Sequence, residues 1–530
     1  MKNYLSEIKD RLNNETNYRY LLFRRGYILT KYDFKIMDGY PFYDIWDKAK
    51  IYDYYLYTHP DCEQHIGTQD GFSAVILGHA YNPLTGEIEE QDILNILLNR
   101  YINNQESFFD YLDELTGVFV VFIIHEEKVF AVQDCGGQKM LYFGEKDGVP
   151  IFTSSPQLAC DLFNLMVSKN VITLLSSKGY YRGSGFLPGN LSPFDELKRL
   201  GSNTFLYYNK NFIIKRFFPR KARKELYSEE EKRVQIDSIV AIMRQNILLA
   251  KRKWPRLAIS LTGGMDSKFT FACSKDLYNS IFCYSFVSKE SERIDAIAAS
   301  EICKKVGIQH HCYQIPINED EIEDYDFLQK IIEHNTSYLC KLHPNEKRKY
   351  IYLERQNDFD TEIKSDMSEV ARAYTTRKYW NVKMPQKLSP RHFTITQGRY
   401  FLEPKEIKIA DEAFELFMKE TGLIDNILGY SMHDLGYWEV RMSSWAATSF
   451  ASQEFFHRIT IPYNNRYLLN LFLQFPEKER IIDQPYWKAI EKANIELANR
   501  EQKVKDSYFS MKRMLLETLY YYYATHMNTK

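Results

Sequence analysis

The side chains best suited to chemistry in this chain surround a pair of glycines. Residues 257–268 read LAISLTGGMDSK, in which an apolar run precedes Gly263 and Gly264, and residues 269–273 form a second apolar run. Adjacent glycines allow a tight turn and a close approach of the backbone to a ligand. The free N–H groups at the start of a following helix suit a phosphate. The segment therefore predicts a buried strand, a phosphate-binding loop and a helix.

The side chains of this loop would complete such a site. The predicted nucleotide-binding residues of the loop are Ser260, Leu261, Thr262, Gly263, Gly264, Asp266 and Ser267. Three of them supply hydroxyl groups, and Asp266 supplies a carboxylate that could hold Mg²⁺ on the phosphates. The spacing differs from GxxxxGK[ST], the loop that cradles the β- and γ-phosphates of a nucleotide. The alternative is a Gly-Gly turn that binds no ligand.

The loop resembles the SGGxDS pyrophosphate loop of the ATP pyrophosphatases. In that class the loop grips the leaving pyrophosphate while the substrate takes the AMP. The resemblance implies that ATP and Mg²⁺ are the cofactors of this chain.

Composition excludes several classes of protein. The chain has 530 residues, a net charge of −1 and 26% charged residues, which is typical of a globular protein of about two to four domains. This charge gives no indication of nucleic acid or a membrane surface as a partner. The eight cysteines form no CxxC pair, the first residues lack a secretory signal, and the longest apolar run is too short to cross a bilayer. We therefore expect a cytoplasmic protein with reduced thiols.

The hydrophobic pattern changes near residue 220. Between residues 71 and 218, short apolar runs alternate with turns, which predicts antiparallel strands and one helix around residues 93–98. Residues 220–231 are highly charged and mark a boundary between domains 1–220 and 221–530. Beyond it, helical and strand patterns alternate. This alternation predicts a doubly wound parallel sheet with ligands at the carboxyl ends of its strands, followed by a helical C-terminal part.

With these segments identified, the chain resembles the asparagine synthetase family from about residue 70 to about residue 485. The similar segments in the second domain are the glycine loop, residues 291–313, WEVRMSSWAATS (438–449) and RITIPYNNRYLL (458–469). In the first domain, residues 115–159 and 186–203 resemble strands of the glutaminase domain and its link to the synthetase domain. The resemblance implies an α/β protein with an N-terminal antiparallel β-sandwich flanked by helices and a C-terminal sheet of the ATP-pyrophosphatase type.

The first domain departs from the family at its nucleophile. The family uses an N-terminal cysteine whose α-amine acts as the base. Here the second residue is Lys2, and no cysteine precedes Cys62. We therefore expect a degenerate, non-hydrolytic relative of the glutaminase domain with a structural or binding role.

A second departure lies at residues 363–374, IKSDMSEVARAY, where the family has a segment like SGEGSDE. In the preferred register, Asp366 takes the place of the acid/base glutamate and Glu369 that of the Mg²⁺-binding aspartate. In the other register, Glu369 moves by one place and Asp366 falls on a glycine. Alternatively, Ser365 or Asp366 caps a helix and Glu369 completes a capping box. Arg372 could touch phosphate or pair with a carboxylate.

The resemblance also implies contacts outside these two segments. Adenine is expected against the strand at 283–287, with Ser285 and Phe286 as cofactor-binding residues. A cation is expected near the β-phosphate, and Lys503 is a candidate, although a solvated helix lysine is the alternative.

A further group of residues could bind the acceptor. Glu439 and Arg441 could form an acceptor-substrate pocket, although an aromatic stripe around them could equally be core. His310 and His311 could act in metal or acid–base chemistry, or pack at the start of a strand.

The resemblance implies a two-step amide synthesis. A carboxylate attacks the α-phosphorus of ATP to give an acyl-adenylate and pyrophosphate, and an amine then displaces AMP. Asp266 and Glu369 would hold the metal, and Asp366 would remove a proton from the amine. The expected partners are a small-molecule, sugar or peptide carboxylate and ammonia or an amine, with surface-polysaccharide or peptide modification as the setting. A homodimer, a lasso-type peptide cyclase and a catalytically inactive nucleotide-binding or scaffold relative remain open.

Overall fold

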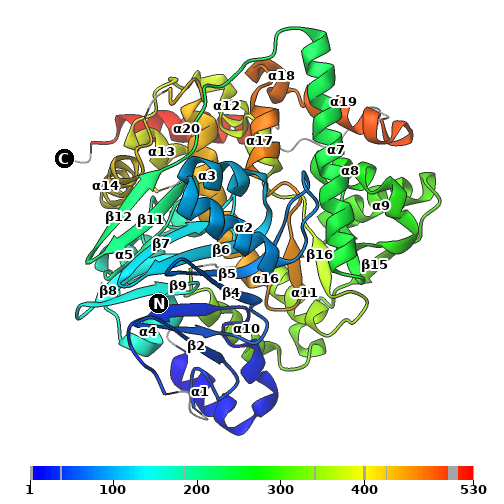
Figure 1. Cartoon of the computed structure of the whole chain (residues 1–530). Coiled ribbons are helices and arrows are strands. Elements are labelled where there is room, and N and C mark those ends of the chain that lie inside the picture. Colours follow the sequence, from blue (N-terminus) through cyan, green and yellow to red (C-terminus); the bar gives the residue numbers. More distant parts are fainter. Residues whose placement is uncertain are drawn as a thin grey trace.

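The computed structural model describes residues 4–35, 39–183, 185–339, 342–397, 401–424, 426–498 and 511–528. Three β-sheets organise these residues. Two antiparallel sheets lie in the first part of the chain, drawn blue to green in Figure 1, and a parallel sheet lies beside the long helix α7 (Glu229–Lys253).

The first sheet has the strand order β10-β8-β9-β1-β3-β2, and its pairs are antiparallel. Its strands are β1 (Tyr27–Thr30), β2 (Asp47–Ile51), β3 (Tyr54–Thr58), β8 (Tyr142–Lys146), β9 (Val149–Thr153) and β10 (Leu197–Arg199). The first 70 residues, which the sequence pattern left unassigned, thus supply half of this sheet.

The second sheet has the order β12-β11-β7-β6-β5-β4 and is also antiparallel. Its strands are β4 (Gln64–Gln69), β5 (Phe72–Tyr81), β6 (Thr116–His125), β7 (Lys128–Gln133), β11 (Thr204–Asn209) and β12 (Asn211–Arg216). All of these strands except β4 fall in the region, residues 71–218, where antiparallel strands are predicted.

The two antiparallel sheets pack face to face. Leu29 and Phe152 of the first sheet share one buried cluster with Val75 and Phe122 of the second. Ile76, the neighbour of Val75, points to the opposite face and packs with helix α2 (Glu90–Asn103), because successive side chains of a strand alternate between faces. The predicted N-terminal β-sandwich is confirmed.

Helices flank this sandwich. They are α1 (Leu5–Asn14), η1 (Thr16–Leu21), α2 (Glu90–Asn103), α3 (Gln105–Glu114), α4 (Pro156–Phe163), α5 (Lys169–Leu175) and α6 (Lys178–Gly183). α2 and α3 bury their apolar sides, Ile93 and Phe108 among them, in the same cluster as Ile76.

The third sheet is parallel and has the order β15-β14-β13-β16-β17. Its strands are β13 (Leu257–Ser260), β14 (Phe282–Val287), β15 (His310–Gln314), β16 (Thr361–Ile363) and β17 (Arg458–Thr460). The chain runs outward from β13 to β15 and then returns to the other side of β13. This reversal places a topological switch point between β13 and β16, where open α/β sheets bind ligands.

Helices surround and extend the parallel sheet, as expected. Those up to β16 are α7 (Glu229–Lys253), α8 (Met265–Cys273), η2 (Lys275–Ser280), α9 (Glu290–Lys305), η3 (Glu319–Glu321), α10 (Tyr325–Asn335) and α11 (Pro344–Glu354). Those after β16 are η4 (Ser368–Arg372), α12 (Tyr374–Lys378), η5 (Trp380–Val382), α13 (Pro390–Thr396), α14 (Pro404–Thr421), α15 (Met432–Gly436), η6 (Tyr437–Ala446), α16 (Ala447–Gln453), α17 (Arg466–Leu473), α18 (Glu477–Ile481), α19 (Gln484–Ala493), η7 (Ile495–Leu497) and α20 (Met511–His526).

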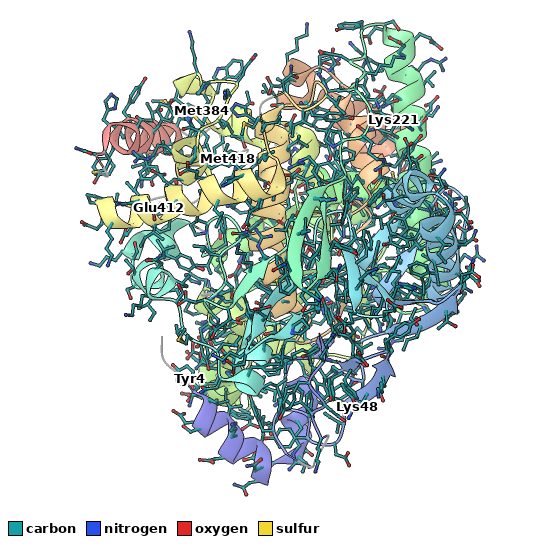
Figure 2. The ribbon with its side chains drawn as sticks, turned by 60° about the vertical axis from the view of Figure 1, so that its left-hand side comes forward. Tyr4, Lys48, Lys221, Met384, Glu412 and Met418 are labelled. Atoms are coloured by element: carbon teal, nitrogen blue, oxygen red, sulfur yellow. The ribbon has the colours of Figure 1, made fainter. Side chains whose placement is uncertain are left out.

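The charged segment between β12 and α7 links the sandwich to the parallel sheet. Lys221 lies at the surface of this segment (Figure 2). We keep the division into 1–220 and 221–530 as a proposal. Among the described helices, none is both long and apolar enough to cross a membrane.

Buried polar contacts join the sandwich to the helical region. Asn464 donates to Asp134 at 2.9 Å, and the indole of Trp438 donates to the carbonyl of Cys135 at 2.9 Å. Arg216 of β12 makes two contacts of 2.6 and 2.7 Å with Glu439 of η6. The sandwich therefore supports η6, which precedes β17, and the segment that follows β17.

Candidate functional site

The glycine loop lies where the sequence pattern predicts it. β13 ends at Ser260 and α8 begins at Met265, so the loop leaves the carboxyl end of the central strand. Leu261 donates its N–H to the carbonyl of Tyr284 at 2.8 Å, which holds the loop against β14. This position is the ligand crevice of a parallel sheet.

Hydroxyl groups shape the loop from within. The Thr262 hydroxyl lies 3.0 Å from that of Ser267 and accepts a hydrogen bond from the N–H of Gly264 at 3.1 Å. Ser285 of β14 donates to the carbonyl of Leu261 at 2.6 Å. The structure thus brings these predicted loop residues and Ser285 together.

The sequence pattern did not single out a carboxylate that lies against the loop. Asp295 of α9 accepts a hydrogen bond from the N–H of Gly263, and a Cβ at Gly263 would lie 3.3 Å from an Asp295 oxygen. Desolvation raises the pKa of Asp295, and the Gly263 N–H opposes that rise. An anion therefore already contacts one of the predicted phosphate donors.

Three predicted carboxylates lie close enough to influence one another. Burial raises the pKa of Glu369 to about 8, with the charges of Asp266 and Asp366 adding to the rise. Burial also raises the pKa of Asp366 to about 6, which Lys364 opposes and Asp266 reinforces. Like charges in a partly desolvated site favour a protonated group or a bound cation.

One of these carboxylates has an unsatisfied oxygen. Oε2 of Glu369 is buried and has no hydrogen-bond partner among the residues that the structure describes. Together with Asp266, it offers the oxygen donors that Mg²⁺ prefers. Mg²⁺ commonly takes one or two protein carboxylates and completes its shell with phosphates and water. No set of three or more described His, Cys, Asp and Glu side chains could hold a metal ion without such help.

Arg372 pairs with carboxylates, which was one of its two predicted roles. Its Nη1 lies 2.7 Å from Oδ1 of Asp266, and its Nε and Nη2 lie 2.7 and 2.8 Å from the oxygens of Asp483. Arg377 also contacts Asp483, at 3.0 Å. Asp266 is therefore held from outside its own loop.

The capping-box alternative for residues 365–369 is wrong. The residue before η4 is Met367, which has no side-chain cap and a φ of +72°. This left-handed conformation suits glycine. In the register that equates Asp366 with the acid/base glutamate, Met367 falls on a glycine of the SGEGSDE pattern, so the backbone supports that register.

Two lysines at the same crevice were not predicted. Nζ of Lys364 lies 2.6 Å from Glu362 and 3.5 Å from the hydroxyl of Ser260. Nζ of Lys349, on α11, lies 4.2 Å from the ring centre of Phe286. No strand is predicted at residues 361–363, so the sequence pattern offered no signal for Lys364, which directly follows β16. The expected cation, Lys503, falls outside the described residues.

The predicted acceptor pocket at Glu439 is wrong. The carboxylate of Glu439 is fully buried and takes two contacts from Arg216 and one, of 3.1 Å, from Asn203. Arg441 lies 4.4 Å from the ring centre of Trp445, within the π-helix η6. Buried aromatic contacts therefore account for much of this stripe.

Of the two predicted roles of His310, the structure favours packing at the start of a strand. Nε2 of His310 lies 2.9 Å from the hydroxyl of Ser285, and burial lowers the pKa of His310. It thus supports the serine that holds the glycine loop.

Two cysteines of the first domain are unsuited to nucleophilic chemistry. Cys62 and Cys135 are buried, and burial raises the pKa of both thiols. A buried thiol is rarely ionised at neutral pH. The structural or binding role expected for the sandwich remains a prediction.

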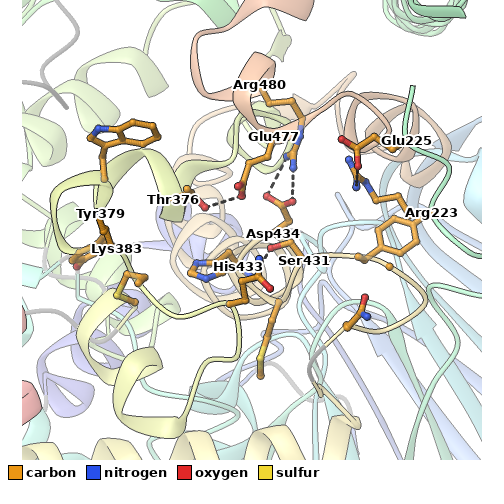
Figure 3. Close-up of a pocket in the computed structure, with 17 residues that line it drawn as sticks. Arg223, Glu225, Thr376, Tyr379, Lys383, Ser431, His433, Asp434, Glu477 and Arg480 are labelled. Carbon is orange, nitrogen blue, oxygen red and sulfur yellow. Dashed lines mark hydrogen bonds and ion pairs between the residues drawn. The ribbon is translucent and has the colours of Figure 1, made fainter. Parts of the chain in front are cut away.

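A cavity of about 780 Å³ lies apart from the glycine loop. Figure 3 shows its ion pair between Arg480 and Asp434 and the hydrogen bond between Thr376 and Glu477. Helices α12 and α18 contribute to its wall, and the N–H of Asp483 donates to the carbonyl of the lining residue Arg480 at 3.1 Å.

Comparison with known proteins gives one distant curated relative. No family model matches the chain. The chain is 22% identical over 256 residues to the microcin J25-processing protein McjC of Escherichia coli. The alignment covers 48% of this chain and 44% of McjC, so the chain spans less than half of that relative's length.

The structural matches are weak. An allosteric regulatory enzyme of purine biosynthesis aligns with a TM-score of 0.26 and 10% identity, over 64% of this chain and 91% of that one. The glutamine PRPP amidotransferase of B. subtilis gives 0.24 and 8%, over 61% and 90%. The glutamine-dependent NAD⁺ synthetase of Acinetobacter baumannii gives 0.20 and 11%, over 52% and 65%. The predicted resemblance to the asparagine synthetase family is confirmed as a distant homology to McjC.

Proposed function

We propose that this protein is an ATP-dependent ligase that forms an amide bond. It would activate a carboxylate as an acyl-adenylate, release pyrophosphate and transfer the acyl group to an amine. The observation that carries the proposal is the meeting of the glycine loop with Asp266, Asp366 and Glu369 at the switch point of the parallel sheet. The distant similarity to McjC supports it.

The first step requires binding and charge stabilisation. The loop N–H groups, together with the hydroxyls of Thr262 and Ser267, would bind the phosphates, and Ser285 would hold the loop in place. Asp266 and Glu369 would hold Mg²⁺, which supplies Lewis-acid stabilisation of the leaving pyrophosphate when bound. The unsatisfied oxygen of Glu369 fits this role.

The second step requires a base for the attacking amine. Asp366 follows β16 at the crevice, and its pKa of about 6 leaves it mostly ionised at neutral pH while keeping it a competent proton acceptor. We therefore assign it the proton from the amine. The sandwich would then serve as a scaffold.

We further propose that the carboxylate substrate is a peptide. McjC is a microcin-processing protein by name, which favours a peptide as the carboxylate substrate here. An amine from the same peptide would make the product a ring, as in lasso-type cyclisation. Ammonia or a separate amine, and a sugar carboxylate, are the other substrates of the same chemistry.

The test is ATP–pyrophosphate exchange with Mg²⁺ over a panel of peptide, uronic acid and amino-acid carboxylates. We expect exchange with one class of carboxylate, and a loss of at least about 100-fold for Asp266→Asn. Asp276→Asn is the matched control, because Asp276 is exposed in η2 just after α8.

A second candidate is an inactive nucleotide-binding protein. The ion pair of Asp266 with Arg372 favours it, because it occupies the predicted metal ligand. ATP binding without exchange on any carboxylate would support this candidate and exclude the ligase.

A further inference from the structure

The ammonium of Lys349 is a half-buried charge at the ligand crevice. We propose that Lys349 and Lys364 together form a clamp for the phosphates of the bound nucleotide. The inference rests on the proposed function for the identity of the nucleotide, and it assigns the phosphate contacts to two residues outside the glycine loop.

Lys349 has no ionic partner within hydrogen-bond distance among the described residues. Its Nζ lies over two aromatic rings, 4.2 Å from the centre of Phe286 and 4.7 Å from that of Tyr350. The nearby carboxylates are engaged elsewhere: Glu346 accepts from the N–H of His343, and Glu292 accepts from Ser288.

This arrangement is unfavourable for the protein alone. A cation that leaves water needs an opposite charge, and contact with aromatic rings offsets only part of the cost. Burial lowers the pKa of Lys349 to about 8, and the positive charge of Lys364 adds to that effect. An anion bound between the two lysines would relieve both penalties.

Lys364 is held in place by an ion pair with Glu362. Its Nζ lies 2.6 Å from Oε1 of Glu362 and 3.5 Å from the hydroxyl of Ser260, the last residue before the glycine loop. Glu362 is fully buried and also contacts Nε2 of His457 at 2.5 Å. Because Glu362 is shared and fixed, the ammonium of Lys364 stays at the edge of the loop.

The position of the pair favours phosphate over another anion. Lys364 follows β16 and Lys349 covers the end of β14, so the two lysines lie on both sides of β13 and its loop. The predicted adenine contact, Phe286, is the ring beneath Lys349. Two point charges beside a loop of N–H groups suit a polyanion such as a triphosphate.

The experiment compares ligands with and without phosphates. Dissociation constants of ATP, pyrophosphate and adenosine are measured by calorimetry on the whole protein with Mg²⁺, for wild type, Lys349→Met and Lys349→Arg. We expect Lys349→Met to weaken ATP and pyrophosphate about 10-fold or more, to leave adenosine unchanged, and Lys349→Arg to restore most of the affinity.

The same helix offers a matched control. Lys347 of α11 pairs with Glu333 away from the crevice, so Lys347→Met should not change ATP binding. For Lys364 the variant is Lys364→Arg, which keeps a charge beside the buried Glu362, and thermal unfolding checks that each variant is folded. Lys364→Arg should weaken ATP less than Lys349→Met.

Each other outcome is decisive. Unchanged ATP binding in Lys349→Met, or equal losses for ATP and adenosine, overturns the clamp. ATP binding that depends on Lys349, without ATP–pyrophosphate exchange, would support the phosphate clamp and exclude the proposed ligase function. If the wild-type protein does not bind ATP, both the phosphate clamp and the ligase function are excluded.

Discussion

The guanidinium of Arg372 lies between Asp266 and Asp483, 2.7 Å from an oxygen of each. Asp266 belongs to the first turn of α8, and Asp483 precedes α19, more than 200 positions further along the chain. The orientation of the predicted metal ligand is therefore set by η4, which lies between β16 and β17, and by the residue that precedes α19.

Loss of Asp483 should destabilise the protein. Asp483→Asn leaves Arg372 and Arg377 without their shared carboxylate, and breaking a buried ion pair costs about 3–5 kcal/mol. Urea unfolding followed by circular dichroism measures the change. Glu491→Gln, at an exposed position of α19, is the control. A loss below about 1 kcal/mol would contradict the structural role of Asp483.

Glu369→Gln should stabilise the metal-free protein while abolishing exchange. The pKa of Glu369 is raised in the folded state, so the stability it contributes is present at low pH and is lost as the pH rises towards about 8. Glutamine lacks this dependence. At pH 5 the free energy of unfolding of the variant should be close to that of wild type. At pH 8 it should exceed that of wild type by about 2 kcal/mol. Urea unfolding without Mg²⁺ at both pH values is the measurement, and a destabilised variant contradicts it.

ATP affinity should fall at alkaline pH. The pKa of Lys349 is lowered to about 8, so its charge is present at pH 7 and mostly lost at pH 9. The positive charge of Lys364, which follows β16, lowers the pKa of Lys349. The carboxylates of Glu346, Glu292 and Glu362 raise that pKa.

Calorimetric titrations at pH 7 and pH 9 measure this effect. We expect ATP to bind about 3- to 10-fold more weakly at pH 9, and the Lys349→Arg variant to vary less, because arginine stays protonated. Identical pH profiles of the two proteins would rule out Lys349 as the titrating group.

The contact between Arg216 and Glu439 should be essential for joining the sandwich to η6. Glu439→Gln removes the charge that neutralises a guanidinium with little access to solvent, and should lower the free energy of unfolding by about 3 kcal/mol. Thermal unfolding is the measurement. Glu412→Gln on the exposed side of α14 is the control (Figure 2). If both variants unfold alike, the ion pair does not stabilise the junction.

Local patterns predicted much of the fold. The long apolar runs of β5 and β6 predict strands that are buried on both faces, and the apolar runs of β13 and β14 predict the strands that flank the glycine loop in space. Two adjacent glycines after a strand are enough to predict the loop. These features depend on residues that are close in sequence.

The sequence by itself determined the glycine loop, the alternation of strands and helices around it, and the carboxylates Asp266, Asp366 and Glu369. Only the tertiary structure decided that Arg372 holds Asp266, that Glu439 pairs with Arg216, and that Lys349 lies over Phe286. Each of these contacts joins segments more than 60 positions apart. Charge and ring contacts of this kind carry no periodic signal, because the packing of whole sheets and helices sets which side chains meet.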